Sequence, residues 1–561
     1  MCFRMNVSDK KGLPVSFYQY GILLFFSIGF LLCVMLRPFG KEMGDASFES
    51  YVISAEEMED LVSGRRETEN LLEKEEAGLL FDGYEVPLEK ERHIFYISQA
   101  LACDRWRGDL RPHGAELSIL EDEYAKNLPE AVAEGHIFEA VLYTEDTWQE
   151  IGILLTGMPV VKIDTEREEP REYPIEDIDN YVFNSETRYY GEITIFQSGI
   201  SAFSEEEEEY RIMQRDVCYH ERGQNSALFS KKSYAIKLLD GQGSGRAESL
   251  FGMQRSTKWK MLAMYSDPNK IRDKVSMELW KEIAERERQF NEKGPVMEYC
   301  EVLLDGEYIG IYGMMLPVDE KTLGLGRTDV LYKILDWYMP EEEEIRASID
   351  QNYMVCYPVR IRYPEKNGQI EKLWEPVIKY FSCKYWNLDF AGYSDMVRAE
   401  NLADYYIFIQ TVAGFDNYLK NTYVYAEKAD NVSGYRMITI PWDLNYTFGN
   451  CYVYEADNYT GFNPDASVNY VEPVQEQLFR SSPGGEADVL KERWNSYRAD
   501  ILSTEHITAL LQDNMDYLLE TGAFARDTDK WPEAGNRSDL SEVKDYVERR
   551  MCYLDEYFAG F

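Results

Sequence analysis

Residues 411–449 read TVAGFDNYLKNTYVYAEKADNVSGYRMITIPWDLNYTFG. Two short runs rich in β-branched and aromatic residues, 422–427 and 435–440, are separated by a polar segment. Two such runs on either side of a polar turn predict a β-hairpin. Carboxylate and amide side chains stand just before the first run and just after the second, so the hairpin decides where they lie.

Three side chains with hard oxygen atoms flank the predicted hairpin: Asp416, Asn421 and Asp443. A loop Asp, an Asn five residues later and a second Asp after a hairpin is the layout of a protein-kinase centre. In such a centre the first Asp accepts the proton of the acceptor hydroxyl, and the Asn and the second Asp bind Mg²⁺. The same spacing is compatible with a turn Asp, a capping Asn and an Asp that ends a strand.

Several motifs in and beyond this stretch resemble one protein family. Pro441-Trp442-Asp443-Leu444, with Thr447-Phe448-Gly449 after it and Asn421-Thr422-Tyr423 before it, resembles the CotH family, the spore coat protein H-like atypical protein kinases. Four other stretches resemble this family in the same order: 222–226 with 231–238, 267–272, 308–312 and 522–531. Ordered motifs carry more weight than one match. The resemblance extends from residue 189 to the C-terminus.

The resemblance implies an α+β, atypical protein-kinase-like, two-lobed domain over residues 185–561. It also implies ATP as the phosphate donor, with Mg²⁺ or Mn²⁺ beside it. The motif positions imply one catalytic base and three metal ligands: Asp416 as the base, and Asn421, Asp443 and Asn445 on the metal. Many members of the family have Asp at the position of Asn445. An amide oxygen can replace a carboxylate at Mg²⁺, although it brings less charge.

Three basic residues are candidates for binding the nucleotide phosphates: Lys237, Lys232 and Arg222. Ala235-Ile236-Lys237 is similar to the kinase strand whose Lys binds the α- and β-phosphates. Side chains alternate along a strand, so Lys232 and Lys237 are expected on opposite faces. The sequence does not decide between these lysines, and an edge strand with solvent-exposed lysines is the competing interpretation.

A second hairpin is predicted over 298–304 and 307–315, because alternating apolar residues flank Asp305-Gly306, a type I′ turn signal. Its motif Tyr308-Ile309-Gly310-Ile311-Tyr312 is followed by Leu316-Pro317, where members of the family usually carry Glu. If that Glu binds an ion or orients a Lys, its loss weakens nucleotide binding. The alternative function is therefore a catalytically impaired domain that serves as a cell-surface binding, adhesion or structural envelope protein. A hydrolase with paired carboxylates is a third interpretation.

Three helices are also predicted in this region. Asp267 as N-cap and Pro268 at the first helical position predict a helix whose apolar face carries Ile271, Val275, Leu279 and Ile283. Ser503 is expected to cap a second helix with an apolar stripe. The last helix is predicted over 541–558, and both C-terminal helices are expected to pack in the core.

The N-terminal part predicts a membrane anchor and a separate domain. Residues 17–36 carry no charge and are long enough to cross a bilayer core. The positive residues before them favour a cytoplasmic segment 1–16 and a domain outside the cell. A cleaved signal peptide is the competing interpretation, but no small-residue cleavage site follows. An acidic linker is predicted over 37–83, and a small, mainly β domain over 84–184.

The composition restricts the partners. A net charge of −42 argues against nucleic acid, because binding to phosphates needs clustered Lys and Arg. The nine cysteines include no C-x-x-C pair and the five histidines are scattered, so neither a zinc site nor a disulfide framework is predicted. The expected partner is a protein substrate that is basic or rich in Ser. The prediction is thus a single-pass atypical protein kinase of the cell membrane, with an extracytoplasmic domain.

Overall fold

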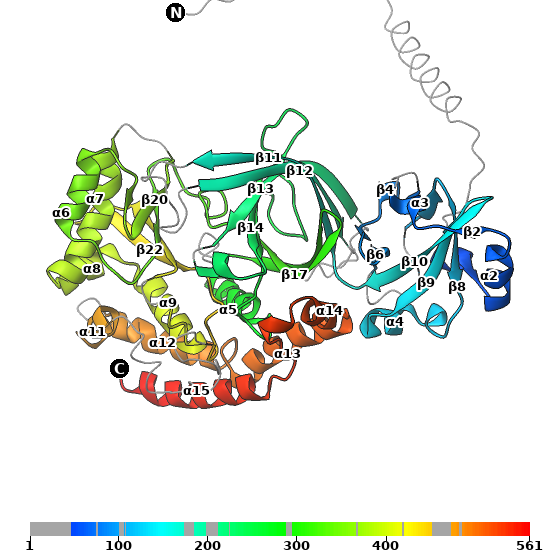
Figure 1. The fold of residues 1–561 in the computed structure, drawn as a ribbon. Helices are drawn as coiled ribbons and strands as arrows, with labels where there is room; N and C mark the ends of the chain where they lie inside the picture. The colour runs from blue at the N-terminus through cyan, green and yellow to red at the C-terminus, as the bar shows by residue number, and fades with distance from the viewer. Residues whose placement is uncertain are drawn as a thin grey trace, which may run out of the picture.

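The computed structural model describes residues 47–73, 77–99, 106, 108–172, 185–197, 211–223, 225–287, 294–365, 369–417, 420–450, 473–481 and 485–561. Within these residues the chain is a mixed α+β protein (Figure 1). The predicted segment 1–16 and the predicted anchor 17–36 lie outside the described residues. Among the described helices, none combines the length and the apolar character that crossing a bilayer requires.

The N-terminal unit, blue to cyan in Figure 1, consists of two sheets and three α-helices in the described part of the chain. The larger sheet has the order β1 (Val52–Ile53), β8 (Glu116–Leu120), β9 (Ile137–Tyr143), β10 (Thr147–Thr156), β6 (Ile94–Ser98) and β5 (Leu88–Glu89), and β2 (Arg66–Glu67) pairs with β10. The smaller sheet has the order β4 (Tyr84–Glu85), β3 (Gly78–Phe81) and β7 (Leu110–His113). The helices are α2 (Ala55–Val62), α3 (Asn70–Glu73) and α4 (Leu128–Glu134).

The described residues 47–73 and 77–83 belong to this accessory unit and differ from the acidic linker that the sequence predicts. Phe48 is fully buried, and its ring centroid lies 4.7 Å from that of Phe138 and 5.6 Å from that of Trp106. β1 pairs with β8, β2 with β10 and β3 with β7, so the three strands within the predicted linker are part of the sheets. The acidic side chains of α2 are exposed: Glu56, Glu57, Glu59 and Asp60. The segment is acidic because these side chains face solvent, and it contains few aromatic residues. A linker has the same composition, so composition alone predicted a linker.

The C-terminal boundary of the accessory unit also differs from the prediction. Residues 160–172 form a strand of a closed barrel instead of the accessory sheet. The barrel has the order β11 (Val160–Glu172), β12 (Ser185–Gln197), β13 (Arg211–Arg222), β14 (Ser233–Leu239), β15 (Lys258–Leu262), β17 (Glu307–Met315) and β16 (Met297–Leu304). β11 closes the barrel by pairing parallel to β16. A linear pattern of apolar residues does not reveal such a distant partner.

The predicted hairpin at the barrel is confirmed. β16 and β17 pair antiparallel around Asp305 and Gly306. These two residues have φ angles of 54° and 81°, as a type I′ turn requires. Tyr308, which follows the turn, is buried in the core of the accessory unit, where its ring stacks on Tyr96 at 5.2 Å. The hairpin therefore belongs to both units.

A second sheet lies at the opposite end of the molecule from the accessory unit (Figure 1). Its order is β19 (Val355–Cys356), β20 (Val359–Tyr363), β18 (Val330–Ile334), β21 (Thr422–Lys428) and β22 (Tyr435–Pro441). The hairpin predicted within residues 411–449 is thus confirmed as β21 and β22. The helices of this region are α6 (Glu342–Asp350), α7 (Ile370–Phe381), α8 (Phe390–Met396) and α9 (Ala399–Val412).

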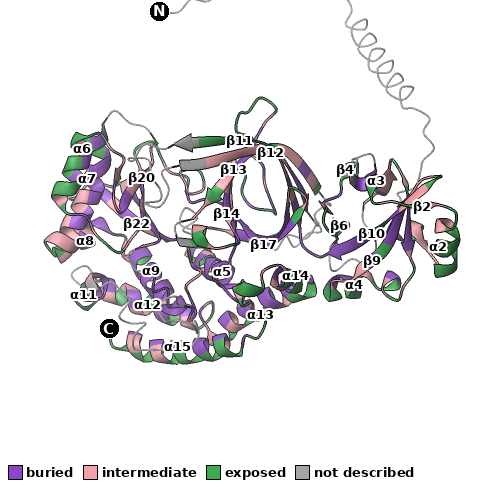
Figure 2. Cartoon of the chain, viewed as in Figure 1, coloured by how far each residue is buried: buried purple, intermediate pink, exposed green. Residues whose placement is uncertain are grey.

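The remaining helices cover one side of the barrel and the second sheet, with buried faces that appear purple in Figure 2. They are α5 (Arg272–Arg286), α11 (Pro473–Ser481), α12 (Glu486–Arg498), α13 (Thr504–Glu520), α14 (Ala523–Lys530) and α15 (Ser541–Ala559). Ser503 caps α13, and α15 lies where it is predicted. α5 starts later than predicted, because Lys270 has a φ of 62°. Asp267 still accepts the first backbone N–H, from Arg272, at 2.8 Å.

A buried polar network joins the accessory unit to the barrel and to the C-terminal helices. The carboxylate of Glu301 on β16 accepts hydrogen bonds from Thr156 at 2.5 Å and from Tyr308 at 2.6 Å. Arg526 of α14 donates two hydrogen bonds of 2.8 Å to the same carboxylate. Because Thr156 ends β10 of the accessory sheet, one carboxylate connects three parts of the chain.

Candidate functional site

One edge of the second sheet brings three chain segments together. Ile334 at the end of β18 pairs with Thr422 at the start of β21, and Thr422 pairs with Pro441 at the end of β22. The residues just beyond these strand ends are therefore neighbours. α9 ends close by at Val412, whose carbonyl accepts the N–H of Phe448 at 2.7 Å. The chain reaches Asp416 from α9 through a short turn, so Asp416 arrives at the same edge.

Asp416 is 2% exposed. Its Oδ2 accepts a hydrogen bond of 2.8 Å from Nδ2 of Asn421. The ammonium of Lys420 lies 3.3 Å from Oδ1 and 3.2 Å from Oδ2 of the same carboxylate. Asp416 and Asn421, which the sequence places five residues apart, are thus in direct contact.

Asn417 joins the loop of Asp416 to the loop of Asp443, although the sequence analysis did not single it out. Its Nδ2 donates to the carbonyl of Trp442 at 2.6 Å, and it lies 3.4 Å from the carbonyls of Asn421 and Asp443. Tyr405 on α9 donates to the Asn417 carbonyl at 2.5 Å. Asn417 is fully buried, so water does not compete for these bonds. Its position next to Asp416 is its one signal in the sequence.

Asp443 is exposed, while its neighbours Trp442 and Leu444 are buried. The φ of Asp443 is 60°, so the chain turns sharply between these two buried anchors. The N–H of Leu444 donates to Oδ1 of Asp273 at 2.9 Å. Asp273 lies in the first turn of α5, so α5 holds the loop that presents the Asp443 carboxylate.

Asp273 is a second buried carboxylate that the sequence analysis missed. Burial raises the pKa of Asp273 to about 8, and the negative charge of Asp443 adds to this effect. The N–H of Leu444 and, more weakly, the positive charge of Arg222 lower the same pKa. Arg222 therefore lies within electrostatic range of the loop of Asp443. Asp273 comes directly after Arg272, the last residue of the 267–272 motif, and this position is the sequence signal that could have identified it.

The carboxylate of Asp416 is poised to exchange a proton near neutral pH. Burial raises the pKa of Asp416 to about 6. The charge of Lys420 lowers this pKa, the charge of Asp443 raises it, and the hydrogen bond from Asn421 lowers it. A general base works best when its pKa lies near the operating pH. Asp416 therefore has the environment of a proton acceptor.

The oxygen donors at this edge fit a hard divalent cation. Nδ2 of Asn421 is bonded to Asp416, so the amide oxygen is the atom that would face a metal ion. Nδ2 of Asn445 donates to the Ser266 hydroxyl at 2.8 Å, which leaves its oxygen in the same way. With the exposed carboxylate of Asp443, they form a one-carboxylate, two-amide set, sufficient for an ion that keeps several waters. In the described part of the chain, no three His, Cys, Asp or Glu side chains are grouped to hold a metal.

The two lysines predicted to bind phosphate contact other parts of the chain than this cluster. Nζ of Lys232 donates to the carbonyl of Ala227 at 2.8 Å. Lys237 is exposed on β14, on the face opposite the buried Ile236 and Leu238, and its stem lies beside Gly245. Among the described contacts, neither lysine is bonded to Asp416 or Asn421.

A different lysine approaches the site from the barrel. Lys260 of β15 pairs in register with Ala235, so it lies on the same outer face of the barrel as Lys237. Its ammonium lies 3.8 Å from the centroid of the Trp442 ring. Because Trp442 precedes Asp443, Lys260 brings a positive charge to the edge of the candidate metal site. No local pattern in the sequence distinguishes Lys260 from other lysines on strands.

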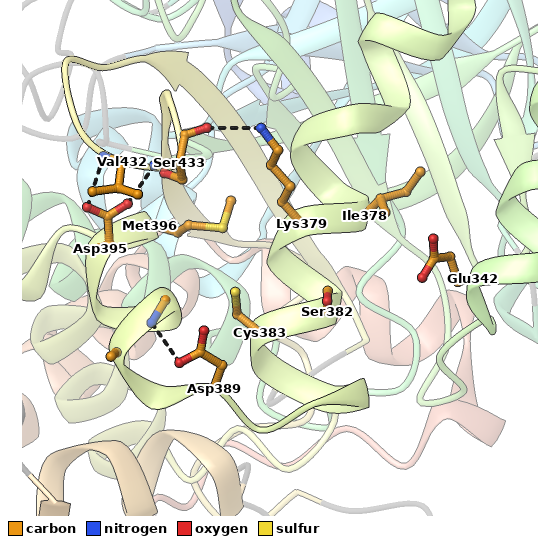
Figure 3. A pocket seen from close by; sticks show the side chains of 12 residues that line it. Glu342, Ile378, Lys379, Ser382, Cys383, Asp389, Asp395, Met396, Val432 and Ser433 are labelled. Carbon is orange, nitrogen blue, oxygen red and sulfur yellow. Dashed lines mark hydrogen bonds between the residues drawn. The ribbon is translucent and has the colours of Figure 1, made fainter.

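A cavity of about 570 Å³ lies elsewhere, beside α7, α8 and the turn between β21 and β22 (Figure 3). In this cavity Asp395 accepts the N–H groups of Val432 and Ser433, and Lys379 donates to the Ser433 carbonyl. None of the lining residues is Asp416, Asn421 or Asp443. The cavity and the candidate site are therefore distinct.

Comparison with known families matches residues 220–554 to the family described as CotH kinase protein. The match covers more than half of the 561 residues, and the chain belongs to the CotH family. It includes Asp416, Asn421 and Asp443, and it leaves out the accessory unit and β11. A search of curated proteins finds no match to the chain.

Proposed function

We propose that this chain is an atypical protein kinase that transfers the γ-phosphoryl group of ATP to a Ser or Thr hydroxyl of a protein. The observation that carries this proposal is the junction of Asp416, Asn421 and Asp443 at one sheet edge. It is supported by the match of the surrounding residues to the CotH kinase family. The fold would then act as two lobes, the barrel and the second sheet with its helices.

Asp416 is the proposed catalytic base. The acceptor oxygen forms a bond to the γ-phosphorus, and the bond from that phosphorus to the bridging oxygen of ATP breaks. ADP leaves with the electron pair, and the hydroxyl proton passes to the Asp416 carboxylate. A pKa of about 6 keeps this carboxylate ionised at neutral pH and still basic enough to accept a proton.

Asn421, Asp443 and Asn445 are the proposed ligands of Mg²⁺ or Mn²⁺. When bound, this ion supplies positive charge against the phosphate oxygens. Arg222 and the lysines of the outer barrel face, Lys237 and Lys260, are proposed to bind the nucleotide phosphates. The ammonium of Lys260 lies over Trp442, and Arg222 acts on Asp273, so both have support from their surroundings. Lys232 has less support for this role, because its ammonium is bonded to the carbonyl of Ala227.

The proposed location is the cell membrane, with residues 17–36 as a single anchor and the large domain outside. This rests on the uncharged stretch and on the positive residues before it. The proposed substrate is a basic or Ser-rich protein of the envelope or coat. Protease added to intact cells should digest the domain, whereas full protection would place it inside.

A specific observation favours a second candidate, a non-catalytic binding or structural protein of the envelope. Leu316 stands where the family usually has Glu, and its side chain is 5% exposed in the barrel core. An apolar core side chain neither binds an ion nor orients a Lys. In this candidate the Asp416 cluster serves to hold the two loops together.

Two substitutions separate the proposed roles. Asp443→Ala should remove the rise in melting temperature that ATP with Mn²⁺ produces, because a ligand stabilises only the state that it binds. Asp416→Asn should keep that rise and slow transfer of labelled phosphate by about 10²- to 10⁴-fold, since it removes the general base. Asp430→Ala is the matched control, because Asp430 is exposed at the far turn of the same hairpin.

The kinase proposal fails if the parent shows neither a shift with ATP and Mn²⁺ nor phosphate transfer to any protein acceptor. The second candidate then takes its place. If Asp443→Ala and Asp416→Asn both bind and transfer like the parent, the cluster is not the catalytic centre.

A further inference from the structure

The ammonium of Lys420 lies between the Asp416 carboxylate and the ring of Trp337. Its ammonium contacts both oxygens of Asp416, at 3.2 and 3.3 Å. On another side it lies 4.9 Å from the centroid of the Trp337 ring. The Lys420 side chain is 15% exposed, so it reaches solvent from between these two groups.

The sheet brings Trp337 to this place. β18 ends at Ile334, which pairs with Thr422, and Lys420 precedes Thr422 by two residues. The loop after β18 therefore runs beside Lys420, and Trp337 on that loop is 36% exposed. A partly exposed Trp next to a buried carboxylate gives the ammonium an aromatic face as a second partner.

Asp416 does not depend on Lys420 for its orientation. Asn421 already donates to Oδ2 of Asp416, and both residues stand on loops that Asn417 joins. A base held by an ammonium on both oxygens accepts a proton less readily. The contact of Lys420 with Asp416 therefore suggests that the ammonium binds another partner during the reaction.

We propose that Lys420 is a second catalytic residue, which binds an oxygen of the γ-phosphoryl group while that group is transferred. This inference rests on the proposed function. The acceptor oxygen must lie within hydrogen-bond reach of Asp416, about 2.6 to 3.2 Å, and on the line of attack at the γ-phosphorus. An ammonium 3.2 Å from the same carboxylate is then within reach of the phosphoryl oxygens.

The charges at this edge support the same assignment. Asp416 and Asp443 carry negative charge at neutral pH, and a nucleoside triphosphate adds more. Phosphoryl transfer is accelerated by positive groups that are in place where charge develops. Lys420 supplies such a charge on the acceptor side, and its contact with Trp337 holds the ammonium when it leaves Asp416. The lysine thus links the base to the phosphate.

The test compares the affinities for ATP and ADP, each measured with Mn²⁺ by calorimetry on the full chain in detergent. The γ-phosphate is what distinguishes the two ligands, so Lys420→Met should weaken ATP binding by about 10- to 100-fold and leave ADP binding unchanged. Transfer should fall by about 10²- to 10³-fold, as for the loss of one stabilising group. Lys420→Arg should keep much of the preference for ATP.

Lys428→Met is the matched control, because Lys428 is exposed at the far end of β21 and its ammonium also lies over an aromatic ring, 3.9 Å from the centroid of Tyr435. A structural role for Lys420 would lower the melting temperature without changing the ratio of the two affinities. If Lys420→Met is folded and keeps the ATP preference of the parent, the inference is overturned even when the parent transfers phosphate. A parent with no preference for ATP over ADP also overturns it. A parent that does not transfer phosphate, but whose ATP preference is lost in Lys420→Met, supports the phosphoryl contact and contradicts the proposed function.

Discussion

Two residues of the site have backbone conformations that residues other than glycine rarely adopt. Asn421 has a φ of 55° and Asp443 a φ of 60°. Asn and Asp tolerate this left-handed region best, but the conformation still costs about 1 to 3 kcal/mol per residue. The amide of Asn417 offsets part of this cost, because it lies close to the carbonyls of both residues. The backbone conformation therefore restricts the residue types at these two positions, whether or not a metal binds there.

At the residue scale, Asp416→Asn should stabilise the protein at neutral pH. Burial raises the pKa of Asp416 from 3.8 to about 6, so between these values the folded chain binds more protons than the unfolded chain. Stability falls as the pH rises through this range, by up to about 3 kcal/mol. The variant should thus melt above the parent at pH 7.5, and the difference should shrink toward pH 4. A difference that does not depend on pH would contradict this.

The residues that the sequence could predict are those whose signal is local. Asp416, Asn421 and Asp443 stand at motif spacings within 28 residues, and the structure places them together. Asp273 was missed because its partner Leu444 lies 171 residues away in the chain. Lys420 and Asn417 were missed for a different reason. Each follows Asp416 closely, but a sequence does not show which polar groups a buried side chain will meet.

At the scale of elements, α14 is fixed to the barrel by an ion pair that water does not reach. The ammonium of Lys231 lies 2.5 Å from Oδ1 of Asp527, and both side chains are fully buried. The same ammonium donates to the carbonyl of Ile311 on β17, whose N–H donates to Asp527. Trp531 adds a bond of 3.0 Å to the Ile309 carbonyl. The 522–531 motif of the family therefore has a structural role.

Lys231→Met should destabilise the protein by about 3 to 5 kcal/mol, because it leaves the Asp527 carboxylate buried without its nearest cation. The double variant Lys231→Met, Asp527→Asn removes both charges and should recover part of this loss. Urea unfolding of the full chain, followed by tryptophan fluorescence, measures both. If the single variant unfolds at the urea concentration of the parent, the pair does not stabilise the fold.

Elements were predictable where turn chemistry is explicit. Asp305-Gly306 specifies its hairpin through two positive φ angles, and Ser503 specifies the start of α13 through one side-chain bond. The start of α5 was not predictable in this way, because Lys270 adopts a φ of 62° that its residue type does not indicate. Its backbone carbonyl accepts a hydrogen bond of 3.0 Å from the hydroxyl of Tyr299 on β16, a tertiary contact that the local sequence does not reveal.

At the scale of the whole molecule, the accessory unit and the barrel are parts of one structure. β10 of the accessory sheet ends at Thr156, and β11 of the barrel starts at Val160. The core of the accessory unit includes Leu303 and Tyr308 of the barrel hairpin. Patterns of apolar residues identified strands in both units, but strand partners decide where one unit ends. β16, the partner of β11 that closes the barrel, follows in the chain only after four intervening strands.

A shortened chain that begins at residue 185 should therefore not fold. It lacks β11, whose Val161 and Ile163 are buried in the barrel, and each such side chain contributes about 1.5 to 3 kcal/mol. A chain that begins at residue 47 keeps β11 and the accessory unit and should unfold cooperatively. Circular dichroism during urea unfolding distinguishes the two. Cooperative unfolding of the chain that begins at 185 would contradict the shared architecture.

The ion pair between Lys231 and Asp527 also sets an order of events during synthesis. The two residues are 296 positions apart in the chain, so the ribosome makes the ammonium long before the carboxylate that neutralises it. Until α14 emerges, desolvation of Lys231 is unfavourable, and this part of the barrel remains hydrated. The nascent chain thus completes its barrel only near the end of translation, and the last helices perform the final step of folding.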